Sequence, residues 1–513
     1  MSAARTLPAT SLLWFARHEL LLAWRDWAAM MAGGRTARER LVTLAVLGFV
    51  AGLHWLALAM LTPLFRRGVS LDKPTLVVLT ASLLTTFSMM LSQAIEHVTR
   101  AFYARADLDL ILSSPAPSRH VFAVRIVSIA VTGALMTALL MAPLINAAVY
   151  LDGAHWLGAY VVVAAMSALS TAISLAIAMA LFATVGPKRT RVIAQIVAAV
   201  VGAALLIAIQ AVAVMVYGNF SRMQVLQSKA VQALAPDLDS WAYIPARALL
   251  GDASLAVTLL AAAAAILLIA VWFYAGRFAS NAVATAGAAE EHDTTTRAVV
   301  PFRSRTTVQA LRSKEWMLLA RDPWLMSQTL MQVLYLIPPA LMLWRDMGSG
   351  EQVHIVLAPV LVMAFGQLAG GLAWLAISGE DAPDLVATAP IPLRALTRAK
   401  VEAVLTVIAA GSAPFIVGLA FVSPWGAGVT ALGIALASAT AIVIQLWFKS
   451  AAKRAMFRRR QISSRGATFA EAFSSIFWAA SAGFAAAQSV FALVFVALAL
   501  LTLGITRVVR PPV

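Results

Sequence analysis

The sequence predicts an all-α protein that crosses a membrane many times, and three observations support this fold class. Hydrophobic residues make up 61% of the 513 residues and charged residues only 12%, whereas soluble domains are about 45–50% apolar and about 25% charged. The apolar residues are gathered into runs of about 20, the length that a helix needs to cross a bilayer. Basic residues are concentrated in alternate loops between the runs. Soluble enzymes and disordered chains are therefore excluded, and the absence of Cys excludes disulfide scaffolds.

Twelve transmembrane helices are expected from the apolar runs. The first ten ranges are 41–65, 75–97, 121–150, 156–185, 192–217, 253–276, 325–344, 354–378, 401–422 and 425–448. The last two, 470–486 and 488–506, form one apolar stretch that is interrupted only by Ala487 and Gln488.

The distribution of Lys and Arg orients these helices. With the N-terminus in the cytoplasm, the cytoplasmic segments contain 32 of the 39 basic residues and the external loops contain seven. This asymmetry follows the positive-inside rule and predicts that both termini are cytoplasmic. It also explains the net charge of +16 without a nucleic-acid partner, because no soluble domain is left to carry a basic groove.

Three segments outside the spans differ from one another in composition. Residues 9–31 form an amphipathic helix, with His18, Glu19, Arg25 and Asp26 on one arc, and we expect this helix to lie in the membrane interface. Residues 281–304 are small and polar, which is typical of a cytoplasmic linker. Residues 218–252 form the one sizeable external loop.

An internal repeat connects the two halves of the chain. Glu19, Arg25 and Asp26 have the spacing E-x5-R-D, and Glu315, Arg321 and Asp322 repeat that spacing in a second interfacial helix at 305–322. A longer motif begins at Asp109 (DLILSSPAPSRHVFAVR) and returns 275 residues later at Asp384 (DLVATAPIPLRALTRAK). The residues matched at that offset are Asp109 and Asp384, Leu110 and Leu385, Pro115 and Pro390, Pro117 and Pro392, Arg119 and Arg394, and Arg125 and Lys400.

The repeat predicts the domain organisation. Residues 1–280 and 305–513 form two six-helix transmembrane repeats, each preceded by its interfacial helix, and the linker 281–304 joins them. Because six is an even number, both repeats start on the same side, so they are parallel and related by an axis along the membrane normal.

The P-x-P loops at 104–120 and 380–396 have two interpretations. Proline fixes φ and disfavours helix at the residue before it, so each loop is expected to be a short helix and a rigid turn. The turn either docks a cytoplasmic partner and receives force from it, or simply caps two spans; the presence of two copies favours docking. The charges of the interfacial helices are likewise either a docking surface or a solvated face.

Polar residues within the spans are candidates for a substrate path. Ser167, Ser170, Thr171 and Ser174 share one face of the fourth span, where small polar residues more commonly mark helix contacts. The ionisable residues within or near spans are taken to be His54, Glu96, His97 and Glu402. His54 is the deepest of them, and its alternative role is packing.

Motifs for catalysis or nucleotide binding are missing from the sequence. It has no H-E-x-x-H, no G-x-S-x-G and no Walker A motif. We therefore expect no catalytic, cofactor-binding or metal-binding residues in this chain. If ATP drives the protein, the ATPase is another chain.

The combination of an interfacial helix, six spans, a short loop helix after the second span and no nucleotide site resembles the ABC-2-type permeases of ABC exporters. The duplication resembles their fused subset, and the stretch from Asp107 to Arg125 is similar to the corresponding loop of such permeases. The resemblance implies export by alternating access in a bacterial inner membrane. It also implies two copies of a separate cytoplasmic ATPase that holds ATP and Mg. By this resemblance the docking residues would be Glu19, Arg25, Asp26, Asp107, Asp109, Leu110, Pro115, Arg119, Glu315, Arg321, Asp322, Asp384, Leu385, Pro390 and Arg394.

Two other function classes stay open at this point. An ion-coupled secondary transporter would need ionisable residues along the membrane, and no chain of acids is seen. A membrane enzyme or a membrane-bound assembly factor is the third interpretation.

Overall fold

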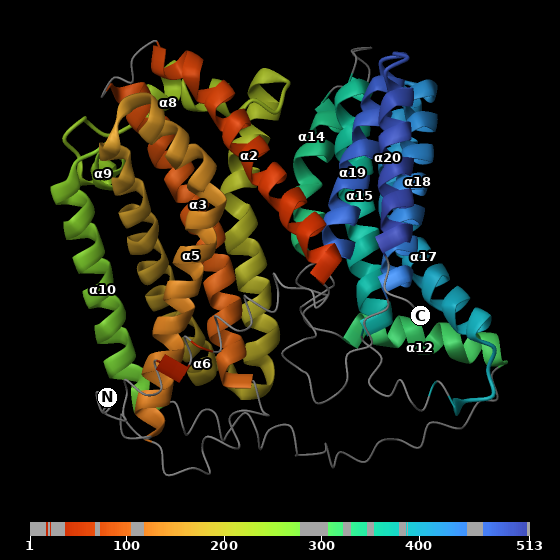
Figure 1. Cartoon of the computed structure of the whole chain (residues 1–513), viewed down its shortest axis with the longest axis horizontal. Coiled ribbons are helices and arrows are strands. Elements are labelled where there is room, and N and C mark those ends of the chain that lie inside the picture. Colours follow the sequence, from red (N-terminus) through yellow and green to blue (C-terminus); the bar gives the residue numbers. More distant parts are fainter. Residues whose placement is uncertain are drawn as a thin grey trace. The chain divides into compact units, whose positions relative to one another are not determined.

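The computed structural model describes residues 17–18, 21, 36–66, 72–103, 117–277, 306–321, 330–345, 353–378, 386, 388–448 and 465–509. Across these residues the regular elements are helices, without a strand (Figure 1). The long helices satisfy their backbone N–H and C=O groups internally, as a hydrocarbon environment requires. The prediction of an all-α polytopic membrane protein is confirmed.

Eight spans in the described part of the chain are long and apolar enough to cross a membrane. They lie in seven elements, because the backbone at Gly186 (φ 75°, ψ 168°) leaves the helical region and breaks α6 into two spans, Ala154–Gly186 and Arg189–Tyr217. The seven elements are α3 (Lys73–Tyr103), α5 (Ser118–Asp152), α6 (Gly158–Val212), α10 (Ala253–Ala275), α15 (Val353–Ser378), α17 (Leu393–Val422) and α18 (Pro424–Phe448).

The four remaining expected ranges also contain helices. Three of these are shorter apolar helices, Val50–Arg66, Leu330–Arg345 and Ala492–Val508, within or overlapping α2 (Thr36–Arg66), α14 (Ile337–Arg345) and α20 (Ala492–Val509). The fourth is α19 (Arg465–Ala486), which is joined to α20 by a turn where Gln488 has a φ of 56°. Twelve complete spans remain a prediction.

The external loop expected at 218–252 is largely helical. It contains α7 (Arg222–Leu226), α8 (Lys229–Leu234), the 3-10 turn η3 (Trp241–Tyr243) and α9 (Ile244–Leu249). Another 3-10 turn, η1 (Ala154–Leu157), joins α5 to α6.

The chain divides into two compact units. The first contains Met1–Leu206 and Arg222–Thr296, and the second contains Ile207–Ser221 and Arg297–Val513. The division after Thr296 falls within the range 281–304 that was expected to be a linker. Residues 207–221 differ from the expected boundaries, because they lie within the expected first repeat, 1–280, but belong to the second unit.

Each unit has its own apolar core. In the first unit, Phe102 of α3 packs against Phe122 of α5 and Phe182 of α6, with ring centroids 6.2 Å and 4.9 Å away. In the second unit, α15 lies between α17, α18 and α19, and Phe365 and Leu361 are among its fully buried residues. Large apolar side chains such as Leu140 and Trp272 remain exposed on the outer helices, as a surrounding of lipid allows.

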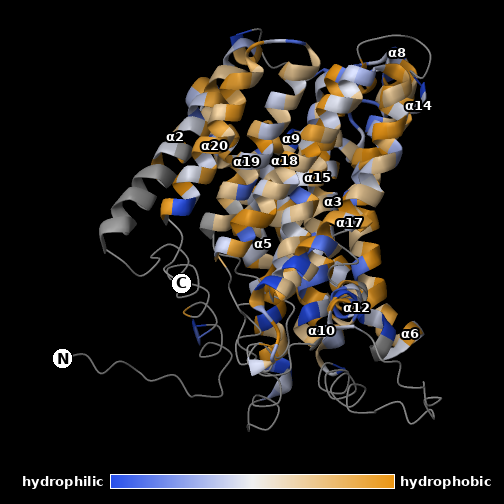
Figure 2. Cartoon of the chain, turned by 90° about the vertical axis from the view of Figure 1, so that its right-hand side faces the viewer, coloured by the Kyte–Doolittle hydropathy of each residue, from blue (hydrophilic) through white to orange (hydrophobic). Residues whose placement is uncertain are grey.

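The helix α12 (Thr307–Arg321) runs in a different direction from the rest of the second unit. Figure 1 draws it across the lower ends of α15 and α17, and Figure 2 shows it end-on. Hydrophobic residues dominate the upright helices in Figure 2. A helix is therefore present within 305–322, and its role as an amphipathic interfacial helix stays a prediction.

The helices α5 and α17 start in the same way. Each follows the second proline of a P-x-P sequence, Pro117 (φ −62°, ψ 115°) or Pro392 (φ −60°, ψ 129°). The Pro117 carbonyl accepts from the N–H of His120 and Val121 at 2.9 and 3.4 Å, and the Pro392 carbonyl accepts from Ala395 and Leu396 at 2.9 and 3.3 Å. The two starts are 275 residues apart, like the two motifs.

Arg345 at the end of α14 holds the segment 207–221 in the second unit. Its guanidinium donates to the Val214 carbonyl at 3.0 Å, within the π-helical turn η2 (Ala213–Tyr217). Gly218 ends this turn with a φ of 70°, and the guanidinium occupies the space that a Cβ at residue 218 would need.

Gly218→Ala should therefore destabilise the protein. The left-handed backbone costs an L-residue about 1–2 kcal/mol, and Arg345 would also have to move. Thermal unfolding of the purified full chain should show a lower midpoint. Gly504→Ala is the matched control, because residue 504 is helical and has open space around it; it should be neutral or stabilising. Equal midpoints for both variants would contradict the role given to Gly218.

Candidate functional site

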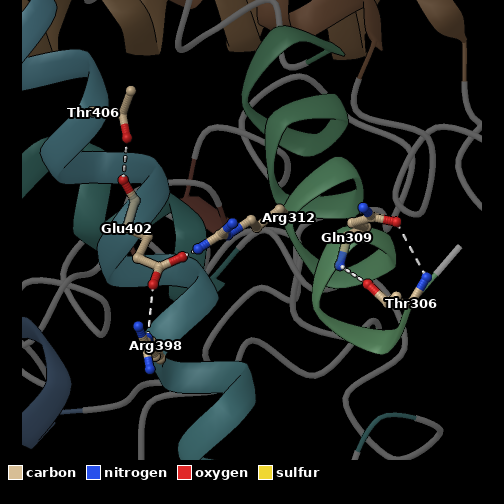
Figure 3. Close-up of polar contacts among 6 residues, drawn as sticks. All are labelled: Thr306, Gln309, Arg312, Arg398, Glu402 and Thr406. Atoms are coloured by element: carbon tan, nitrogen blue, oxygen red, sulfur yellow. Dashed lines mark hydrogen bonds and ion pairs between the residues drawn. The ribbon is translucent and has the colours of Figure 1, made fainter.

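The start of α12 is fixed by a capping box. The Gln309 N–H donates to the Thr306 hydroxyl at 3.3 Å, and the Thr306 N–H donates to the Gln309 side-chain oxygen at 3.2 Å (Figure 3). These bonds satisfy two backbone donors that a helix start leaves unpaired. The box fixes where the helix begins, and hence which residues face the bundle.

A buried ion pair joins α12 to α17. Glu315 is fully buried, and its Oε1 and Oε2 lie 3.1 and 3.2 Å from the Lys400 ammonium. Lys400 also donates to the Ala376 carbonyl near the end of α15. Lys314 reaches the same carboxylate from the neighbouring position of α12, at 3.3 Å. One carboxylate and one ammonium therefore connect three helices.

A second, exposed ion cluster lies beside the first. Glu402 of α17 accepts from Arg312 of α12 and from Arg398 of its own helix, each at 2.7 Å (Figure 3). The hydrogen bond to Glu402 raises the pKa of the Arg312 guanidinium, which keeps its charge. Exposed pairs contribute little stability, about 0–1 kcal/mol in surveys. The buried pair is therefore the more costly of the two to break, and the exposed pair adds orientation.

Both contacts use the same face of α12. Arg312 and Glu315 are three residues apart, so they are neighbours on the helix surface. Their partners Glu402 and Lys400 lie two residues apart at the beginning of α17. The α12–α17 junction, consisting of these four residues with Arg398, is the candidate functional site.

The position of Glu315 corrects the view of it as part of an exposed acidic face. Its carboxylate faces the interior and is paired within the chain, so it is not available to a partner protein. Its basic partner is Lys400. The sequence motif had already matched Lys400 with Arg125, which occupies the corresponding position of α5.

Only some of the other predicted docking residues are among the residues that the structure describes. Pro390 is exposed at the turn that leads into α17, Arg394 is exposed in the first turn of α17, and Arg119 lies at the start of α5. Arg321 is the last residue of α12. The rest lie outside the described residues: Glu19, Arg25, Asp26, Asp107, Asp109, Leu110, Pro115, Asp322, Asp384 and Leu385.

The residues predicted for a substrate path separate into two places. Ser167, Ser170 and Thr171 line a cavity of about 180 Å³ in the first unit, whereas Ser174 and His54 do not. The Nδ1–H of His54 in α2 donates to the Val50 carbonyl at 2.8 Å, and its Nε2 accepts from the side-chain amide nitrogen of Asn146 in α5 at 3.2 Å. Tyr160 of α6 donates to that same Asn146 at 2.9 Å, so these bonds connect three helices and support the packing interpretation of His54.

Glu471 was missed at the sequence level. It lies on α19, where its Oε2 accepts from Gln445 of α18 at 2.6 Å. Its carboxylate occupies the space beside Gly370 of α15 that a side chain at residue 370 would fill. The sequence could have indicated this residue, because Glu471 lies inside the expected span 470–486, and an ionisable residue within a span is a candidate functional residue.

In comparisons with known proteins, no protein-family model, no curated protein and no solved structure matches this chain. Any functional assignment therefore rests on its own sequence and structure.

Loss of the Lys400 ammonium should strongly destabilise the second unit. Lys400→Met leaves the Glu315 carboxylate buried beside Lys314 alone, and breaking a buried pair costs about 3–5 kcal/mol. The double variant Glu315→Leu/Lys400→Met should recover most of that loss, because neither charge is then buried. Arg398→Met is the matched control, since it removes only an exposed contact. Unfolding of the purified full chain measures all three; a Lys400→Met variant as stable as the wild type would disprove the assigned role.

Proposed function

We propose that this chain is the fused transmembrane subunit of an ATP-driven ABC exporter, powered by two copies of a separate cytoplasmic ATPase that binds ATP and Mg. The observation that carries the proposal is the α12–α17 junction. It fastens a crosswise helix at the end of the bundle to the helix that begins at the exposed turn around Pro390 and Arg394. A subunit that receives force from a partner needs such a rigid connection beside its contact surface.

The junction transmits displacement because its parts are costly to separate. The Lys400 ammonium bonds Glu315 of α12 and the Ala376 carbonyl of α15, so a push on the turn before α17 moves three helices together. Breaking the pair would leave two buried charges without compensation. In this proposal, ATP binding on the partner closes the cytoplasmic ends and the resulting rearrangement exports the substrate.

The proposal includes two parallel six-helix repeats with cytoplasmic termini in a bacterial inner membrane. The matching geometry at Pro117 and Pro392 and the 275-residue offset support the repeat. The unequal distribution of basic residues supports the orientation. Anionic lipids at the cytoplasmic surface would attract the basic residues between 449 and 465.

One observation favours the second candidate, an ion-coupled secondary transporter. Glu471 is a carboxyl group within the helix packing of α15, α18 and α19, where a transporter could bind a cation or a proton. The two candidates differ in their energy source. Transport into vesicles that needs ATP and survives collapse of the ion gradients supports the exporter, and the opposite result supports the secondary transporter.

Site-directed cross-linking should detect the ATPase. Because the chain has no Cys, a single introduced Cys gives one attachment point. Arg394→Cys lies in the exposed first turn of α17, and Asp239→Cys, whose side chain is fully exposed in the loop 218–252, is the matched control. A cross-linker at residue 394 should capture a protein with a Walker A motif, identified by mass spectrometry, with a yield that changes on adding ATP. Capture at residue 239 alone, or no ATPase at either position, would count against the proposal.

The repeat predicts a second buried pair between Glu19 and Arg125. Glu315 and Lys400 correspond to these residues in the two motif pairs. Glu19→Lys should lower the unfolding midpoint of the full chain, and Glu19→Lys/Arg125→Glu should restore part of it. The swap Glu315→Lys/Lys400→Glu, at the pair whose contact is known, is the positive control. If Glu19→Lys has no effect, the shared spacing has no structural role in the first half.

A further inference from the structure

The first unit contains a cavity that its helices leave unfilled. It has a volume of about 180 Å³ and lies between α3, α5 and α6. Ser167, Ser170 and Thr171 of α6 form its buried floor. Gln93 and His97 of α3, both exposed, stand at its mouth. Convergent polar groups in a concave site are typical of small-molecule binding.

The hydroxyl groups of the floor have already donated their hydrogens. Ser167 donates to the Ala130 carbonyl of α5 at 2.7 Å. Ser170 and Thr171 both donate to the Ser167 carbonyl, at 3.0 and 2.8 Å. A hydroxyl group has one hydrogen and two acceptor lone pairs. The floor therefore accepts hydrogen bonds from a ligand and has no hydrogen left to donate.

The cavity lining carries no formal negative or permanent positive charge. Its residues include no Asp, Glu, Lys or Arg. The nearest charges along α3 are those of Glu96 and Arg100, which pair with each other. Burying an ion without a countercharge is expensive, so this lining disfavours carboxylates and ammonium ions as ligands. The walls contributed by Met90 and Met136 are apolar and adaptable.

The corresponding place in the second unit is filled. The offset of 275 residues extends to the helix ends, since α3 ends at Tyr103 and α15 at Ser378. At this offset Met90, Gln93 and His97 correspond to Phe365, Leu368 and Leu372, all buried in the apolar core. Gly133 corresponds to Ile408, another buried core residue. The cavity is therefore a feature of one half that larger apolar residues close in the other.

We propose that this cavity binds a small, neutral, single-ring molecule that carries a hydrogen-bond donor, of the phenol class. A cavity of about 150 Å³ holds one benzene ring, so about 180 Å³ accommodates a ring with one substituent. The donor bonds to the lone pairs of Ser170 and Thr171, and the ring lies against the two methionines. The proposal is independent of the transport function, because the chain alone supplies every group.

The experiment measures binding of phenol to the purified full chain in lipid nanodiscs, by the ligand-dependent rise in unfolding midpoint. Toluene is the matched ligand control, since it replaces the hydroxyl with a methyl group. Ser170→Ala and Thr171→Val remove one acceptor each while preserving the shape. Ser174→Ala is the matched protein control: this serine is buried on the same helix face and donates to the Ser170 carbonyl at 2.7 Å, but it does not line the cavity.

Phenol should stabilise the wild type saturably and more than toluene does. Each acceptor variant should weaken phenol binding about two- to tenfold, the range for one hydrogen bond, and Ser174→Ala should leave it unchanged. Thr132→Phe, at an exposed position of the lining, should block phenol even if the buried variants fold poorly. Equal effects of phenol and toluene on every variant would show only partition into the bilayer and would overturn the proposal. Tighter binding of benzoate than of phenol would also overturn it.

Discussion

The constraint on which this structure depends is that hydrocarbon offers no hydrogen-bond partner. Helices meet it for the backbone, and several hydroxyl side chains of the spans meet it in the same way. Thr85, Thr184 and Thr430 each donate to the carbonyl four residues earlier, at 2.8, 2.9 and 2.7 Å. A hydroxyl used in this way costs the membrane protein little. It also leaves its oxygen as an acceptor, which explains how a row of serines can be both a packing surface and the floor of a cavity.

Charges obey a stricter form of the same constraint. Glu315 can be fully buried because Lys400 compensates it and the Ala376 carbonyl uses another of the ammonium hydrogens. The charge of Glu402, two residues further along α17, is compensated differently, by two arginines at an exposed position. The junction therefore has two kinds of contact. The Glu315 pair is costly to break, and water can replace the partners of Glu402. A moving part that must stay attached while its surroundings rearrange benefits from both.

The sequence predicts the elements well and their contacts poorly. Length and apolarity are local properties, so α3, α5 and α18 were found from composition alone, and the basic residues at 186–191 marked the place where Gly186 breaks α6. The partner of Glu315 depends on how α12 crosses the foot of α17, which no spacing along one helix reveals. The pairing of Glu315 with Lys400 was therefore not predicted. The cavity was predicted only in part: Ser167, Ser170 and Thr171 were candidates for a substrate path, but the volume exists because three helices fail to fill it, which their sequences do not reveal.

The segment 207–221 makes the two units differ from the two halves of the sequence. Since it belongs to the second unit while residues on both sides of it belong to the first, the chain passes between the units after residues 206, 221 and 296. A cut within 281–304 severs only the last of these passages. The first fragment would then carry residues 207–221 of the second unit, whereas Arg345, which bonds Val214 in that segment, would be on the second fragment. The second fragment would therefore lack part of its own unit, so a division at the linker does not separate the two units cleanly.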